Sequence, residues 1–204
     1  MGPVKWRLFG RLTLFTVEGS CFFMQLLEKF VNFVDSMSDR IGHFIGWMTT
    51  LMVLVVFYDT VMRYAFNRGN VALQELEWHL FAIVFLIGAA YTLKDGGHVR
   101  VDILYVNLSE KTKAWIDFLG VFIFLIPFSV MVILSTKGFI MNSWAVREVS
   151  PDPGGLPAYY IIKSMIPLGF SLLIVQGLSE AAKNFMILMG YNLKVTRKRQ
   201  VDQS

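Results

Sequence analysis

The stretch WIDFLGVFIFLIPFSVMVILST, residues 115–136, decides the fold, because its body from Phe118 to Ile133 carries no ionisable side chain. A hydrocarbon core about 30 Å thick is crossed by roughly 20 apolar helical residues. Three other stretches have a similar length and composition, so we expect spans over residues 41–62, 73–93, 115–136 and 158–178. The sequence therefore predicts an all-α integral membrane protein with four transmembrane helices.

The overall composition excludes a soluble fold. Of the 204 residues, 55% are hydrophobic and only 17% are charged, whereas an ordinary soluble domain is about 45–50% apolar. A soluble chain of this length would have to bury all four apolar blocks in one core, with little polar surface to cover them. The single cysteine, Cys21, excludes an internal disulfide framework and a cysteine-based metal cluster.

Lysine and arginine are distributed unevenly between the segments that flank the spans. Five precede the first span, four lie in the second loop and five follow the fourth span, whereas the first and third loops hold two each. Cytoplasmic loops carry the excess of basic residues, so we expect both termini in the cytoplasm. The net charge of +4 is then a topology signal in a lipid bilayer, and no nucleic-acid partner is expected.

Residues 1–40 form a separate N-terminal segment in this prediction, followed by the transmembrane domain at 41–189 and a basic cytoplasmic tail at 190–204. Apolar residues in and after this segment recur at alternating steps of four and three, which is one helical face: Phe23, Leu27, Phe30, Val34, Met37, Ile41 and Phe44. We expect an amphipathic helix that lies in the cytoplasmic interface, or packs on a partner, before the chain turns into the membrane.

A signal peptide over residues 1–24 is the competing interpretation of the N-terminus. Basic residues do precede an apolar run there, but Glu18 interrupts that run and no small-residue cleavage site follows. The amphipathic helix is therefore the preferred prediction.

Ionisable groups inside a membrane usually mark substrate paths or proton relays, and the middle of each span contains none. Gln176 is the only strongly polar side chain there, while five ionisable residues lie near the outer interface, where long side chains can reach water: Asp59, Glu75, Glu77, His79 and Lys163. The three histidines also lack the arrangement of a bis-histidine haem site. His43 and His79 are predicted on opposite sides of the bilayer, and His98 is in a loop. We expect no catalytic, cofactor or metal site in this chain, and hence no enzyme.

Two loops carry turn signals. KDGGHVRVD, residues 94–102, follows the second span directly, and its glycines can end a helix by adopting positive φ. SPDPGGLP, residues 150–157, is predicted to form a rigid turn on the outer side.

The arrangement resembles a known family, the DctQ-like small membrane subunits of TRAP transporters, over about residues 30–190. The resemblance rests on four spans with both termini inside, on Glu75 and Trp78 at the start of the second span, and on Ala90-Tyr91 leading into the GGHVRVD turn. The segment from Ser150 to Pro157 is similar to a branch labelled for mannitol or chloroaromatic compounds. The motif and interface candidates are Glu75, Trp78, Gly96, Gly97, His98, Val99, Arg100, Asp102, Pro151, Gly154, Gly155 and Pro157.

The resemblance implies a role in a sodium-coupled importer of organic acids in the bacterial inner membrane. In that family a periplasmic binding protein captures the substrate, and a large membrane subunit carries it across by an elevator-type movement. The small subunit is thought to brace the immobile scaffold of the large one. Sodium is accordingly expected at the large subunit, with no cofactor in this chain.

Two alternatives remain open at this point. A membrane anchor of a redox enzyme would be distinguished by a haem absorbance band. A homodimeric four-helix exporter would need an essential membrane carboxylate, for which Asp59 and Glu75 are the candidates. Four residues of the outer side are either contacts for a docked binding protein or solvated interface charges: Arg63, Arg68, Glu75 and Arg147.

Overall fold

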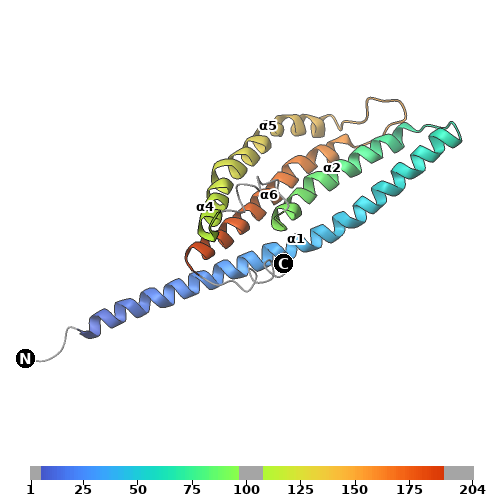
Figure 1. Ribbon diagram of the computed structural model, residues 1–204. Coiled ribbons are helices and arrows are strands. Elements are labelled where there is room, and N and C mark those ends of the chain that lie inside the picture. The colour runs from blue at the N-terminus through green and yellow to red at the C-terminus, as the bar shows by residue number, and fades with distance from the viewer. Residues whose placement is uncertain (1–5, 97–107, 191–204) are drawn as a thin grey trace, which may run out of the picture.

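Helices make up the regular structure of the described part of the chain. The computed structural model describes residues 6–96 and 108–190, with side chains described from residue 22 onward. Figure 1 shows the elements, which are α1 (Trp6–Ala65), α2 (Val71–Lys94), α4 (Glu110–Gly120), the π-helical turn η1 (Val121–Leu125), α5 (Ile126–Ala145) and α6 (Tyr159–Leu188).

Four helical segments are long and apolar enough to cross a membrane. Within the described residues they are Phe22–Ala65, Val71–Lys94, Glu110–Ala145 and Tyr159–Leu188. The prediction of an all-α membrane protein with four spans is confirmed. Each helix extends beyond its predicted span because polar end residues continue the helix past the apolar block.

Short-range signals in the sequence explain where α2 begins and ends. The side chain of Asn70 caps its first turn by accepting a hydrogen bond from the Ala72 amide at 2.9 Å. At the other end Gly96 adopts a φ of 70°, and its amide donates to the Leu93 carbonyl at 3.2 Å. The predicted glycine turn after the second span is therefore confirmed at Gly96. The remaining candidates of that turn, Gly97, His98, Val99, Arg100 and Asp102, lie outside the described residues.

The third span consists of three continuous pieces, α4, η1 and α5. The π-helical turn ends where the Ile126 amide donates to the Val121 carbonyl, five residues back. Pro127 follows at the start of α5. Proline lacks the amide hydrogen that would continue the regular ladder, so the wide turn lies directly before the position where that donor is missing.

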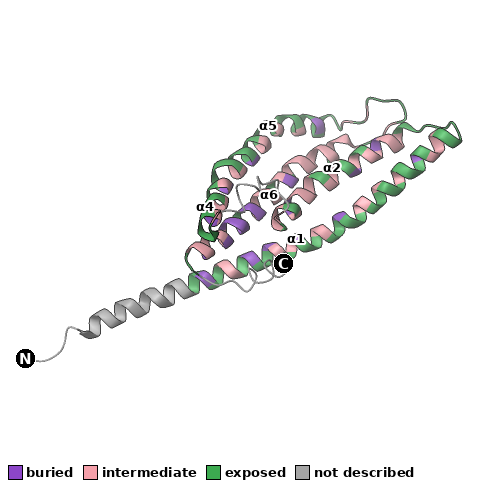
Figure 2. Ribbon diagram, viewed as in Figure 1, coloured by how far each residue is buried: buried purple, intermediate pink, exposed green. Residues whose placement is uncertain are grey.

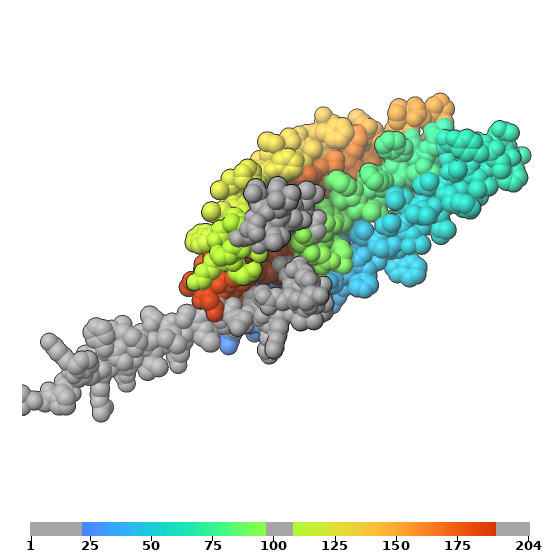
Figure 3. Space-filling view, viewed as in Figure 1, coloured from blue at the N-terminus to red at the C-terminus, as the bar shows by residue number. Residues whose placement is uncertain are grey.

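Helix α6 is the centre of the assembly, because it packs against α1, α2, α4, η1 and α5. Figures 1 and 3 show α1 along one edge of the molecule and the arc of α4 and α5 along the other, with α2 and α6 between them. Small residues allow the close approach. A Cβ atom added to Gly169 of α6 would lie only 2.7 Å from the carbonyl oxygen of Leu86 in α2.

Helix α1 overturns the prediction of a turn between an N-terminal helix and the first span, because it runs without a break from Trp6 to Ala65. No proline interrupts this stretch, and Gly42 packs closely against a neighbouring helix. A Cβ atom at Gly42 would meet the ring of Tyr91 on α2 at 2.5 Å. The glycine therefore serves a close helix contact and not a change of direction.

The packed face of α1 is also offset from the predicted one. Its buried or half-buried positions repeat at steps of three and four, as in a coiled coil: Met24, Leu27, Val31, Val34, Ser38, Ile41 and Ile45. Three predicted face residues, Phe23, Phe30 and Phe44, are exposed. In Figure 2 exposed residues accordingly line much of α1 and α5. Lipid is as apolar as a protein core, so large apolar residues need no burial against another helix.

Candidate functional site

Most of the buried polar side chains gather in two clusters. The α1–α6 network consists of Asp35, Ser38, Gln176, Ser179, Glu180 and Lys183. The Glu75 clamp consists of Glu75, Ser150, Gly155, Leu156 and Tyr159.

The length of α1 between Asp35 and Asp59 is comparable with the thickness of a bilayer core. Asp35 belongs to the network, and Asp59 lies near the end of α1 that faces the start of α2. The 24 residues between them span about 36 Å at 1.5 Å per residue. Because the hydrocarbon core is about 30 Å thick, this part of α1 is long enough to cross it, and its Asp59 end lies next to the start of α2, which carries Glu75 of the clamp.

Lys183 is the charged centre of the α1–α6 network. Its Nζ atom lies 2.8 Å from both carboxylate oxygens of Asp35 and 2.8 Å from Oε1 of Glu180. The side chain of Lys183 is 7% exposed, and those of Asp35 and Glu180 are 13% and 11% exposed. Burial of this kind requires that the charges be paired, so the lysine fixes the N-terminal half of α1 on α6.

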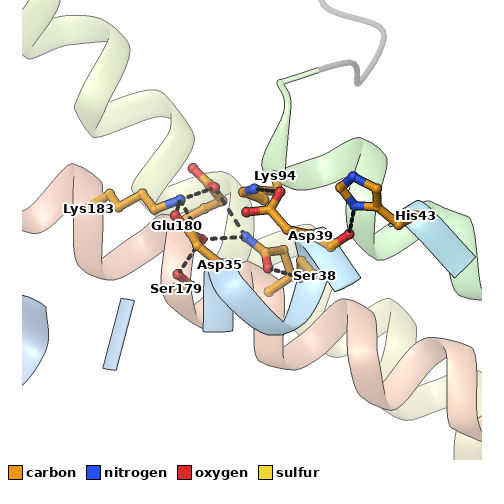
Figure 4. Close-up of polar contacts among 9 residues, drawn as sticks. Asp35, Ser38, Asp39, His43, Lys94, Ser179, Glu180 and Lys183 are labelled. Carbon is orange, nitrogen blue, oxygen red and sulfur yellow. Dashed lines mark hydrogen bonds and ion pairs between the residues drawn. The ribbon is translucent and has the colours of Figure 1, made fainter. Parts of the chain in front are cut away.

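Neutral groups complete the network. The Ser38 hydroxyl donates to the Gln176 carbonyl oxygen at 2.6 Å. The Gln176 amide nitrogen lies 3.3 Å from both Asp35 and Glu180, and the Ser179 hydroxyl lies 3.4 Å from Asp35. Figure 4 shows Lys183 and Glu180 extending from α6 toward Asp35. The only strongly polar side chain predicted in mid-span thus bonds to α1 and to its own helix.

The C-terminal end of α2 contacts α1 beside the α1–α6 network. Lys94 forms an ion pair with Asp39, and the Asp39 carbonyl lies 2.8 Å from Nδ1 of His43. Apolar packing lies beside the network, where Met24 and Val31 of α1 contact Met186 of α6. Three helices are therefore joined at this end of the molecule.

Glu75 is the acceptor of the clamp at the other end. Its carboxylate accepts hydrogen bonds from the Ser150 hydroxyl, from the Leu156 amide at 2.5 Å and from the Tyr159 hydroxyl at 3.0 Å. The residue is 7% exposed, so the expectation that Glu75 reaches water is wrong. Hydrogen bonds to a charged acceptor are roughly twice as strong as neutral ones, and these three hold the α5–α6 loop, residues 146–158, and the first residue of α6 against α2.

Gly155 permits the close fit of the clamp. A Cβ atom there would lie 2.7 Å from Oε1 of Glu75 and closer still to the Ser150 side chain. Gly154 adopts a φ of 84°, which an L side chain rarely tolerates. Pro151 and Pro157 flank this turn, which the Ser150 amide closes by donating to the Leu156 carbonyl at 3.2 Å. The rigid turn predicted for residues 150–157 agrees with this geometry.

The side of the clamp nearer α6 is aromatic. The rings of His79 and Tyr159 meet edge to face with centroids 5.1 Å apart, and Nδ1 of His79 lies 2.5 Å from the Glu75 carbonyl. Trp78, by contrast, is 75% exposed. The two family-motif residues of α2 therefore face different surroundings.

An ion pair ties the α5–α6 loop to α6. Lys163 binds Glu148, and its ammonium lies 4.0 Å from the centroid of the Phe139 ring on α5. The hydrogen bond from Lys163 holds the pKa of the Glu148 carboxyl below its ordinary value. Nearby, the indole nitrogen of Trp144 donates to the Ser164 hydroxyl at 2.8 Å.

The structure brings together five of the predicted motif residues, all in or beside the clamp: Glu75, Pro151, Gly154, Gly155 and Pro157. Gly96 lies at the opposite end of α2. The α1–α6 network was missed, apart from Gln176. A signal was present, because residues 176, 179, 180 and 183 share one face of α6, as residues 35 and 38 share one face of α1.

The polar atoms of both clusters are engaged in joining helices and loops to one another. Within residues 22–96 and 108–190, no three His, Cys, Asp or Glu side chains are grouped so that they could hold a metal ion. Both clusters therefore act as structural contacts between helices and loops.

Comparison with known proteins gives a family assignment. The family model for the DctQ component of tripartite ATP-independent periplasmic transporters matches residues 52–186. Two Haemophilus influenzae proteins, each assigned as a TRAP transporter small permease protein, are 29% identical over 106 residues and 26% identical over 98 residues. These alignments cover 52% and 47% of this chain and 66% and 53% of the relatives, so the chain spans between about half and two thirds of their length. No solved structure matches.

Proposed function

Because this chain belongs to the DctQ family of tripartite ATP-independent periplasmic transporters, we propose that it is the small permease subunit that braces the large transport subunit of such a system. The relatives are permease components, which suggests a role other than catalysis. The family assignment and the four apolar helices make it a multi-pass membrane protein.

The α1–α6 network is the observation that carries the bracing role. A subunit that moved an anion or a cation by itself would place charge or broken helices near the midplane. Here the buried charges lie near the interfaces, and Lys183, Asp35 and Glu180 join two helices far apart in sequence. Such cross-links favour a rigid body, which is the property required of a support for a moving partner.

The clamp supports the same role on the other side. Glu75 is enclosed by the α5–α6 loop and holds that loop in one shape. This removes Glu75 from the candidates for direct contact with a docked protein, and it also makes Glu75 a poor carboxylate for an exporter. Arg68 and Arg147 remain exposed on the same side and are the proposed contacts for a periplasmic binding protein.

The finer assignments are part of this proposal. They comprise sodium coupling at the large subunit, an organic-acid substrate, a bacterial inner-membrane location and cytoplasmic termini. The branch labelled for mannitol or chloroaromatic compounds stays a proposal, supported by the sequence of residues 150–157. An uptake panel of organic acids and polyols, run with and without sodium, tests the substrate and the coupling ion.

Affinity purification of the tagged chain from its native membrane, followed by mass spectrometry, tests the subunit role. We expect a much larger polytopic membrane protein to co-purify with no haem absorbance band. Recovery with a soluble redox enzyme, or of the chain alone, contradicts the proposal. An untagged membrane preparation is the control for adventitious capture.

The bracing role itself is tested in cells that lack this chain and are complemented with variants. Lys183→Met should lower the yield of the complex and the maximal transport rate together, without changing the substrate concentration for half-maximal uptake. The matched control, Lys113→Met, removes an ion pair with the exposed Glu110 of α4 and should leave both unchanged. A variant with full complex yield and an altered half-saturation value would contradict a purely supporting role.

A further inference from the structure

The apolar blocks of neighbouring helices end at different levels along α1. Helix α2 ends at Lys94, which pairs with Asp39 of α1. The uncharged body of the third span begins at Phe118, whose ring centroid lies 6.3 Å from that of Phe185 on α6. Phe185 in turn packs against the apolar cluster that Val31 of α1 forms with α6. The third span is therefore still apolar at a level of α1 that lies beyond the end of α2.

A flat bilayer surface meets both levels only if the helix bundle is tilted. Eight residues of α1 separate Asp39 from Val31, which corresponds to about 12 Å at 1.5 Å per residue. In Figure 1 the start of α4 and the end of α6 extend further toward the N-terminal part of α1 than the end of α2 does. Tilting is a common way for long apolar helices to fit a bilayer, and the bilayer surface then slopes across the bundle.

The surface of α1 over residues 22–40 is divided as such a slope requires. At about 100° per residue, its side chains form three sectors whose centres lie about 120° apart. One sector packs on α6 and includes Val31 and Val34. The second, which we call the phenylalanine face, is exposed and apolar, and consists of Phe22, Phe23, Leu26, Phe30 and Phe33. The third is exposed and polar, and includes Gln25, Asn32, Ser36 and Asp39.

The side chains of the phenylalanine face favour lipid over a partner helix as their neighbour. Close contacts between membrane helices use small residues, as Gly42 of α1 does against Tyr91, whereas this face consists of four Phe and one Leu. Phe22 and Phe33 are 70% and 71% exposed. The same sector continues into the spanning part of α1 at Phe44, which is also exposed.

Two basic side chains lie where this face borders the polar sector. Lys29 and Arg40 are exposed at that border, while the acidic residues Glu28 and Asp39 lie on the opposite side of the helix from the phenylalanine face. Long basic side chains reach from apolar surroundings to polar headgroups, and basic residues beside an apolar helical face favour binding to anionic lipid. The charges therefore complement a bilayer surface.

We propose that the phenylalanine face binds the bilayer surface at the end of the molecule that holds the α1–α6 network. Helix α1 then crosses the membrane obliquely, with its polar sector in water. The N-terminal segment keeps the amphipathic character expected from the sequence, but a tilt of the whole bundle replaces the expected turn. This inference is independent of the transporter assignment.

Spin-label accessibility tests this placement. The label is attached to Phe33→Cys, and the adjacent Asn32→Cys is the matched control. Both are made in full-length protein in which Cys21→Ser removes the one native cysteine. The protein is purified with its native partners and reconstituted in bilayers of phosphatidylethanolamine and phosphatidylglycerol. We expect oxygen dissolved in the lipid, and not a water-soluble nickel chelate, to reach the label at position 33, and the reverse at position 32.

Two results overturn the proposal. Access of the nickel chelate to both positions would place the face in water, beside an upright bundle. Protection of position 33 from both reagents would show that a partner subunit, and not lipid, covers the face. Leu26→Cys, with Gln25→Cys as its control, repeats the comparison about two turns closer to the N-terminus. This pair gives a separate test if Phe33→Cys fails to insert, and an upright bundle would place it further from the lipid.

Discussion

The α1–α6 network and the Glu75 clamp both stabilise buried carboxylates, but they do so with different donors. The network uses the formal charge of Lys183 between two acids, whereas the clamp surrounds one acid with hydroxyl and amide donors. A charged donor makes the loss of one partner costly, since the other charges stay buried. Neutral donors spread the energy over several contacts. The comparison teaches that one cluster fixes helix to helix, while the other fixes a loop to a helix.

Removal of the network lysine should have the largest effect. Lys183→Met leaves Asp35 and Glu180 without their cation, so we expect a loss of about 3–5 kcal/mol in the free energy of unfolding. Thermal unfolding in detergent or the yield of folded protein measures it.

The matched control is Lys113→Met, which breaks an ion pair with the exposed Glu110 on α4. Exposed pairs contribute about 0–1 kcal/mol. Equal losses in the two variants would show that burial does not distinguish the network from a surface ion pair.

Loss of the clamp charge should have an intermediate effect confined to one end of the molecule. Glu75→Gln keeps the shape of the side chain but replaces one acceptor with a donor, which cannot bind the Leu156 amide or the two hydroxyls equally well. We expect a loss of about 2–3 kcal/mol and faster hydrogen exchange at Leu156. Exchange in the N-terminal half of α1 should not change. Faster exchange at both ends would mean that the two clusters are not independent.

The spans could be predicted from the sequence because apolar length is a local property, as the run from Phe118 to Ile133 illustrates. The packed face of α1 could not. Phe30 is more apolar than Ser38, yet Ser38 is buried and Phe30 is exposed, because the bilayer accepts the aromatic ring and only another helix can satisfy the hydroxyl.

Only part of the candidate site could be predicted from the sequence. Glu75 was identified through a family resemblance, but its partners come from a loop more than 70 residues away and follow from no spacing rule. Lys183 pairs with Glu180 one turn away on its own helix, but its other partner, Asp35, is 148 residues away on α1. Pairing over such distances depends on tertiary packing, which a single sequence does not encode as a pattern.

Two adjacent glycines of the clamp should respond differently to alanine. Gly155→Ala places a Cβ atom 2.7 Å from Glu75 Oε1 and closer to Ser150, so the clamp must open at a cost of about 1–2 kcal/mol. Gly154→Ala meets no atom within 4 Å, and only its positive φ opposes the change, by roughly 1 kcal/mol. Limited proteolysis of the α5–α6 loop separates the two. Greater cleavage for Gly154→Ala would show that backbone strain, and not contact with Glu75, limits the loop.

The smallest expected effect is a pH dependence of the loop that holds the clamp. Lys163 lowers the pKa of Glu148, so the folded state favours the ionised carboxylate more than the unfolded chain does. The resulting stability is present above the unfolded pKa of Glu148 and is lost as the pH falls through its lower folded pKa. Glu148 is partly exposed, and solvent screening keeps this contribution small. Proteolysis of the loop at decreasing pH should accelerate in wild type, and Lys163→Met should weaken this dependence, because the hydrogen bond from Lys163 is the largest cause of the lowered pKa of Glu148. An identical pH profile in both would place the acid sensitivity elsewhere, with Glu75 of the clamp as the next carboxylate to substitute.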